Sequence, residues 1–150
     1  MTIKEKLEKD LEKALRENDF FKRDALRFLL ATLQNKEIEA RGKNKVLEET
    51  EIIDLLRKEA KKRMESFNIY QGAGRNDLAS KEKMEADLIL SYLPQEMSDE
   101  ELSDLINAVI KELGVNSLKE MGKVIQEVAK RASLRASPSR IATMVKEKLS

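Results

Sequence analysis

The residues best suited to chemistry in this 150-residue chain are basic and lie near its C-terminal end. From Gly122 onward there are seven lysines or arginines and only two glutamates, whereas the residues before Gly122 carry a net negative charge. A basic end on an acidic body favours a polyanionic partner, such as the phosphate backbone of a nucleic acid. The alternative interpretation is a run of charge that forms only a solvated helix face.

The densest part of this basic segment combines three kinds of phosphate-binding group. Guanidinium groups, hydroxyls and the start of a helix all fall between residues 131 and 140, and such groups contact nucleic-acid backbones. The segment has no aromatic residue for stacking on bases. This favours recognition of the shape and phosphates of a folded RNA over reading of a single strand, and no DNA specificity is expected. The candidate RNA-binding residues are Lys123, Lys130, Arg131, Arg135, Ser137 and Arg140.

Catalytic chemistry finds little support in the composition. The chain contains no histidine and no cysteine. Thiolate nucleophiles, disulfides and catalytic sites of the Ser-His-Asp or Cys-His type are therefore excluded. A serine nucleophile would have only lysine as its base, and nothing in the sequence marks such a pair. We predict no catalytic residues, no cofactor and no metal site.

Two other motifs receive structural interpretations. Glu82 and Glu85 share one helical face and resemble half of a di-metal site, but the known helical pattern adds a histidine three residues after a glutamate. They are predicted to form a solvated acidic face. Gly72-Ala73-Gly74 lacks the strand and the Lys-Ser/Thr ending of a phosphate loop, so we interpret it as a turn between helices.

Apolar residues recur at helical spacing along nearly the whole chain, and no segment alternates as a strand would. The second helical pattern, from Phe21 to Ile38, has the broadest apolar face and is predicted to be the most buried helix. The other helical patterns cover residues 3–15, 49–70, 78–92, 102–113, 121–128 and 141–149.

Cap signals delimit these helices. Ser98 and Ser117 each precede a glutamate by three residues, which is the pattern of a capping box. Asn76 or Asp77 is expected to cap the helix that follows the glycine turn. Gly114 lies where a left-handed residue ends a helix. Ser137-Pro138 pairs a cap residue with proline at the first helical position.

Leu93-Pro94-Gln95 marks the predicted domain boundary, because proline blocks continuation of the preceding helix. We therefore expect an all-α fold with an N-terminal multi-helix domain (1–94) and a small C-terminal three-helix domain (95–150). The N-terminal residues have no signal-peptide pattern, and no apolar run is long enough to cross a membrane. These observations predict a cytoplasmic protein without membrane association.

Several motifs, spaced along the chain in order, resemble the YqeY family. They lie at residues 29–39, 62–66, 70–79, 82–85, 92–95, 98–102 and 120–124. The resemblance covers essentially the whole chain and implies a C-terminal three-helix bundle of GatB/YqeY type. The motif residues to which it assigns a mainly structural role are Arg75, Asp77, Leu78, Tyr92, Leu93, Pro94, Met121 and Gly122.

The YqeY family is similar to the C-terminal part of GatB, the B subunit of the tRNA-dependent amidotransferase, where this part is a tRNA-binding appendage. The resemblance implies a tRNA-binding accessory protein, with an amidotransferase or an aminoacyl-tRNA synthetase as possible protein partners. One alternative is carbon–nitrogen ligase activity with glutamine as amide donor, within an amidotransferase complex. Another is a protein-interaction adaptor that acts through the acidic N-terminal part.

The chain departs from the family pattern at one place. Family members tend to have Gly-Arg-Ala-Asp-Gly or a similar sequence after the Met-Gly-Lys helix, where this chain has Leu134-Arg135-Ala136-Ser137-Pro138. The lost glycine removes easy access to a positive φ and to close backbone approach. The Ala-x-Pro pattern is closer to that of the GatB tail.

Overall fold

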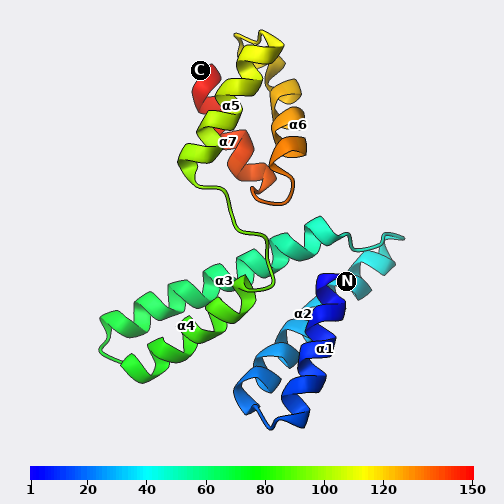
Figure 1. Cartoon of the computed structure of the whole chain (residues 1–150), viewed down its shortest axis with the longest axis vertical. Helices are drawn as coiled ribbons and strands as arrows, with labels where there is room; N and C mark the ends of the chain where they lie inside the picture. Colours follow the sequence, from blue (N-terminus) through cyan, green and yellow to red (C-terminus); the bar gives the residue numbers. More distant parts are fainter. The chain divides into compact units, whose positions relative to one another are not determined.

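The computed structural model describes residues 1–150, and its fold is all-α, as the sequence predicts (Figure 1). Seven α-helices and one 3₁₀ turn (η1) follow one another, and there is no strand. Contacts divide the chain into two compact units, Met1–Leu93 and Pro94–Ser150. The helices are α1 (Ile3–Arg16), α2 (Phe20–Gly42), α3 (Glu49–Gly72), α4 (Asn76–Leu90), α5 (Asp99–Leu113), α6 (Met121–Ala132) and α7 (Pro138–Leu149), and η1 is Leu118–Glu120.

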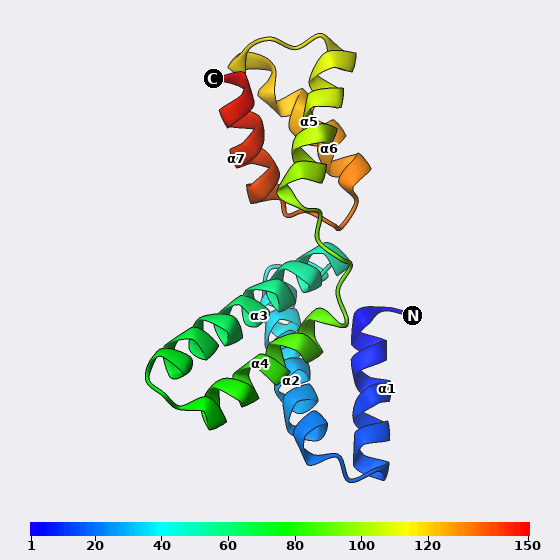
Figure 2. The same cartoon turned by 60° about the vertical axis from the view of Figure 1, so that its left-hand side comes forward.

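The first unit consists of two helical hairpins, α1 with α2 and α3 with α4 (Figure 2). Asn18 adopts φ 55° in the first turn, and the Asp19 side chain caps α2 by accepting from the backbone N–H of Lys22. Gly74 adopts φ 75° in the second turn. This left-handed conformation suits glycine and confirms that Gly72-Ala73-Gly74 is a turn between helices.

Long-range contacts join the two hairpins. The backbone N–H of Ile3 donates to the Glu49 carboxylate at 3.0 Å, which satisfies a free donor at the start of α1. The phenol of Tyr92 donates to the carboxylate of Asp10 on α1. The fully buried Leu7, Leu26, Leu29, Leu33 and Leu56 are the largest core side chains of this unit.

The second unit is a three-helix bundle, and three of its helix ends have the predicted cap residues. The hydroxyl of Ser98 accepts from the N–H of Glu101, and that of Ser137 accepts from the N–H of Arg140. Gly114 ends α5 with φ 66°, in the left-handed region that favours glycine. The fully buried side chains of the core are Leu102, Ile106, Val109, Val124, Val128, Ile141 and Val145.

Three local predictions are wrong. Arg75, and not Asn76 or Asp77, occupies the N-cap position of α4, and no side chain bonds there. Ser117 makes no capping hydrogen bond, because the chain after it forms the 3₁₀ turn before α6 begins. Five residues are buried on α3 and only three on α2, so α2 is not the most buried helix.

Candidate RNA-binding site

Helix α6 presents two of the predicted lysines to solvent. Val124 and Val128 are buried and fix which side of α6 faces the core. Lys123 and Lys130 are exposed and form no ion pair. They are seven residues apart, which places them on the same side of the helix. We define the α6 strip as the exposed residues of this side, Gly122, Lys123, Gln126 and Lys130.

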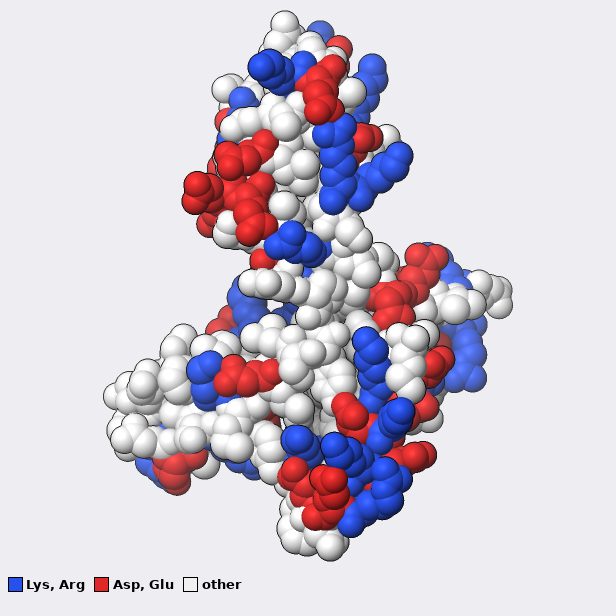
Figure 3. Space-filling model, viewed as in Figure 1, with Lys and Arg blue, Asp and Glu red and all other residues white.

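The predicted arginines are held by carboxylates instead. Arg131 donates to Glu112 on α5 and to Glu127 on its own helix, the latter at 3.0 Å. In Figure 3, basic side chains lie along the α6 side of this unit and acidic ones gather around the start of α5. The hydrogen bond from Arg131, together with its positive charge, lowers the pKa of the Glu112 carboxyl.

The other two arginines, Arg135 in the loop after α6 and Arg140 in the first turn of α7, bind the segment at the start of α5. Arg135 donates to the Glu101 carboxylate and to the backbone carbonyl of Gln95, both at 2.9 Å. Arg140 donates to Asp99 at 2.7 Å. These contacts leave the three predicted arginines anchored within the unit, while the two predicted lysines remain available to a partner.

The loop between α6 and α7 contains a strained residue directly before the segment in which the chain departs from the family pattern. Ser133 adopts φ 55° and ψ −126°, a conformation that residues with a side chain rarely occupy. The loop therefore requires a positive φ at position 133, although the sequence supplies no glycine there. Ser137 is a predicted RNA contact, but its hydroxyl caps α7 by accepting a hydrogen bond from the backbone N–H of Arg140.

The family-motif residues have different environments. Arg75 and Asp77 form an exposed ion pair at 3.3 Å, and its hydrogen bond lowers the pKa of the Asp77 carboxyl. Met121 packs against the core of the second unit. A Cβ added at the exposed Gly122 would meet no atom within 4 Å, so packing within the chain does not require glycine there. Leu78, Tyr92, Leu93 and Pro94 are half-buried.

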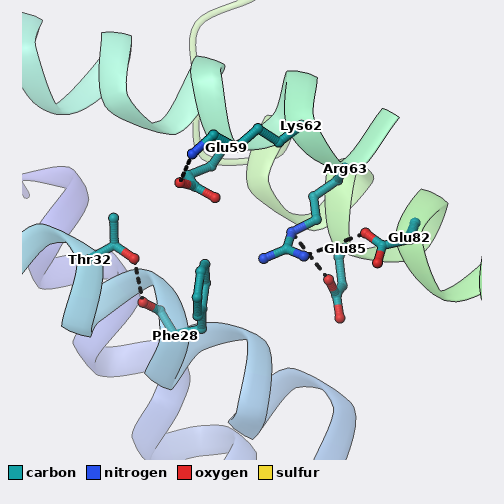
Figure 4. A network of polar contacts seen from close by, with 7 residues as sticks. All are labelled: Phe28, Thr32, Glu59, Lys62, Arg63, Glu82 and Glu85. Carbon is teal, nitrogen blue, oxygen red and sulfur yellow. Dashed lines mark hydrogen bonds and ion pairs between the residues drawn. The ribbon is translucent and has the colours of Figure 1, made fainter. Parts of the chain in front are cut away.

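The two glutamates that resemble half of a metal site are partners of an arginine (Figure 4). The guanidinium of Arg63 on α3 lies 3.5 Å from Glu82 and 3.4 Å from Glu85, so these carboxylates do not form the solvated acidic face that we expected. The same guanidinium lies 5.0 Å from the ring centre of Phe28 on α2. No group of three or more acidic residues is placed to hold a metal ion.

The carboxylates that bind the arginines of the basic segment could not be identified from the sequence. Asp99, Glu101 and Glu112 lie on α5, and they are 41, 34 and 19 residues from the arginines that they bind. Their only sequence signal is the run Asp99-Glu100-Glu101 after a predicted cap, which also fits the ordinary preference of helix N-termini for acidic residues.

Comparison with known proteins confirms the family resemblance. The family model described as "Yqey-like protein" matches residues 4–149. The chain is 38% identical over 109 residues to "Altered inheritance of mitochondria protein 41, mitochondrial" of Eremothecium gossypii, covering 71% of this chain and 58% of that protein. The protein of the same name from Lachancea thermotolerans is 33% identical over 141 residues, covering 90% of this chain and 74% of the relative.

A third relative, the protein of that name from Saccharomyces cerevisiae, is 34% identical over 120 residues, covering 80% of this chain and 63% of the relative. The chain thus spans between 58% and 74% of the length of these relatives.

These relatives contradict the predicted cytoplasmic localisation, because their names place them in mitochondria. That prediction rested on the lack of a recognisable targeting segment, and such a lack carries no positive information about a compartment. None of the helices has the length and apolar character that crossing a bilayer requires.

Proposed function

We propose that this chain, which belongs to the Yqey-like protein family, is a tRNA-binding accessory protein related to the amidotransferase tail. The C-terminal unit contacts the folded RNA, and the observation that carries the proposal is the α6 strip. Two lysines without carboxylate partners lie there beside a glycine for which the fold supplies no packing reason. The resemblance to the tRNA-binding tail of GatB supports the choice of tRNA among polyanions.

The lysines of the strip are spaced to engage separate phosphates. Lys123 and Lys130 are two helical turns apart, or about 10 Å along the axis of α6. Because both ammonium groups are exposed, binding a phosphate costs them little desolvation and breaks no ion pair. Each contact releases counterions from the RNA, so binding weakens as the salt concentration rises.

Gly122 allows a partner to approach the backbone of α6 closely within the α6 strip. Glycine within a helix costs about 1 kcal/mol relative to alanine. Apart from its chain neighbours and the adjoining backbone of α6, no atom of the chain lies within 4 Å of the position that a Cβ would occupy. An external backbone that lies against α6 at this point would benefit from the missing side chain, and a sugar-phosphate backbone is such a partner.

We expect the three arginines to contribute less to tRNA binding than their number suggests. Carboxylates of the same unit form ion pairs with all three arginines, Arg131, Arg135 and Arg140. Ion pairs with a partly exposed partner contribute little to stability, so these contacts hold the arginines in the free protein without preventing an exchange of partner. They can turn from carboxylate to phosphate, but the acidic partners remain near the RNA and repel it. The two lysines therefore carry more of the binding free energy than the three arginines.

The test measures tRNA affinity against salt for the full chain and its variants. We expect Lys123→Ala/Lys130→Ala to weaken binding and to reduce the slope of log K against log salt by about 2. The control Lys111→Ala/Lys146→Ala removes the same charge from exposed positions on α5 and α7 and should reduce the slope far less. Equal slopes for the wild type and the α6 variant would refute the proposal.

An Arg131→Ala/Arg135→Ala/Arg140→Ala variant measures the role of the arginines. We expect a smaller loss of affinity than with the lysine pair, because these arginines are already paired with four carboxylates of the same unit and have less positive charge to offer a phosphate. A larger loss would mean that the arginines contribute more to tRNA binding than the two lysines.

An assay with misacylated tRNA, glutamine and ATP distinguishes tRNA binding from the amidotransferase alternative. The purified chain should bind tRNA and give no turnover.

A further inference from the structure

The first unit contains a cavity of about 560 Å³ that the proposed RNA contact does not use. It lies between α1, the start of α2 and the end of α4, and all its lining residues belong to this unit. Its volume is within the range of small-molecule sites. Buried Ala14 and half-buried Leu88 and Tyr92 contribute to its wall.

Four lysines surround this cavity: Lys6, Lys9 and Lys13 on α1, and Lys22 on α2. None of these ammonium groups has a carboxylate partner, in contrast to the arginines of the second unit. Four cationic groups therefore face two acidic ones in the lining, Asp10 and Glu17, and the cavity carries a net positive charge. Groups of like charge repel one another, and an anion in the cavity would relieve that repulsion.

The positive charge follows from how α1 distributes its side chains. Lys6, Lys9 and Lys13 recur at helical spacing on the cavity side. The glutamates at positions 5, 8 and 12 have the same spacing one residue earlier, and none of them lines the cavity.

A hydrogen bond fixes the opposite wall. Tyr92, just beyond α4, donates its phenol to the Asp10 carboxylate on α1. Burial, followed by this hydrogen bond and the negative charge of Asp10, raises the pKa of Tyr92, so the phenol keeps its proton at neutral pH. The bond occupies an oxygen of Asp10, which reduces the repulsion that this carboxylate would exert on an anion.

We propose that this cavity binds the oligophosphate group of a small phosphorylated molecule. Lys6, Lys9, Lys13 and Lys22 hold the phosphates as point charges, and the wall of Ala14, Leu88 and Tyr92 accommodates an apolar part of the same ligand. The bounded volume favours a small molecule over an RNA backbone, which requires an extended groove. The site is in the first unit and is independent of the proposed tRNA contact.

Calorimetry with the full chain at low salt tests the proposal, with tripolyphosphate and ATP as probes. We expect tripolyphosphate to bind with a Kd below about 1 mM. Tighter binding of ATP would identify a nucleotide as the source of the phosphates, and equal binding would identify the oligophosphate group alone. Either result supports the site. Failure of both probes to bind below about 10 mM would overturn it.

Paired variants establish the location. Lys9→Ala/Lys13→Ala should weaken tripolyphosphate binding about tenfold, since each ammonium group contributes Coulomb attraction at short range. The control Lys43→Ala/Lys45→Ala removes the same charge from the exposed segment after α2, which is not part of the cavity, and should change the Kd less than about twofold. An equal loss in both variants would mean that net charge alone attracts the ligand. The tRNA affinity of the cavity variant is measured as well. If it falls as much as the tripolyphosphate affinity, the cavity binds RNA and not a small ligand, and the proposal is wrong.

Discussion

Arg63 on α3 contacts two further helices through one guanidinium, so a single substitution there removes several contacts at once. It lies against Phe28 of α2 and pairs with Glu82 and Glu85 of α4 (Figure 4). The Arg63 side chain is 25% exposed, and the two carboxylates are 16% and 19% exposed. Arg63→Ala leaves both carboxylates largely out of water without a cation, which destabilises more than the loss of a surface ion pair.

The expected loss for Arg63→Ala is about 2 kcal/mol in the free energy of unfolding of the first unit. A cation–π contact contributes about 0.5–1 kcal/mol of this, and the uncompensated carboxylates contribute the rest, less than for a fully buried pair because both retain some water. With a typical urea dependence for a unit of this size, the midpoint falls by about 1–2 M.

Tyrosine fluorescence during urea unfolding measures this loss for the first unit alone, because Tyr70 and Tyr92 are the only tyrosines and tryptophan is absent. Lys61→Ala is the matched control, since it removes an exposed positive charge from the same helix. We expect it to change the free energy by less than about 0.5 kcal/mol. If Arg63→Ala and Lys61→Ala shift the midpoint equally, Arg63 does not join the helices in the way described.

Three further variants test separate features. Ser133→Gly relieves the positive φ between α6 and α7 and should stabilise the second unit by about 1 kcal/mol, measured by hydrogen exchange of the buried α6 amides; slower exchange in the wild type than in the variant would contradict it. Tyr92→Phe should destabilise the first unit by about 1 kcal/mol at neutral pH. Because the pKa of Tyr92 is raised by folding, its contribution is complete below the ordinary tyrosine pKa of about 10 and declines at higher pH. Urea unfolding followed by circular dichroism at pH 7 and 11 should therefore show a smaller difference between wild type and variant at pH 11. Gly122→Ala should stabilise α6 in hydrogen exchange yet weaken tRNA binding; unchanged affinity would remove the glycine from the proposed contact.

The features that the sequence predicted correctly are those decided within a few residues. Ser98 and Ser137 cap their helices, and Gly114 ends α5, because each depends on the local backbone and on side chains within one turn. Ser117 has the same local pattern as Ser98 and does not cap. The difference arises because the residues after Ser117 form a 3₁₀ turn, a choice that the spacing of Ser and Glu does not determine.

The candidate RNA-binding site is shaped by contacts between residues far apart in the sequence, and the spacing of residues does not predict such contacts. The basic segment was found from composition alone, but Arg135 and Arg140 bind carboxylates on α5 that become neighbours only when the bundle forms. The cavity of the first unit was missed for the same reason, since Lys22 and Tyr92 reach it from distant segments. The spacing of Lys6, Lys9 and Lys13 was its one visible signal.

The most direct test of the proposed tRNA contact is to map it on the full chain by amide chemical shifts during a tRNA titration. We expect the largest shifts on residues 122–131 of α6, with smaller ones around Arg135 and Arg140. The shifts along α6 should diminish in Lys123→Ala/Lys130→Ala. Shifts confined to the first unit, or no shifts at tRNA concentrations well above physiological, would contradict the assignment of RNA binding to this helix.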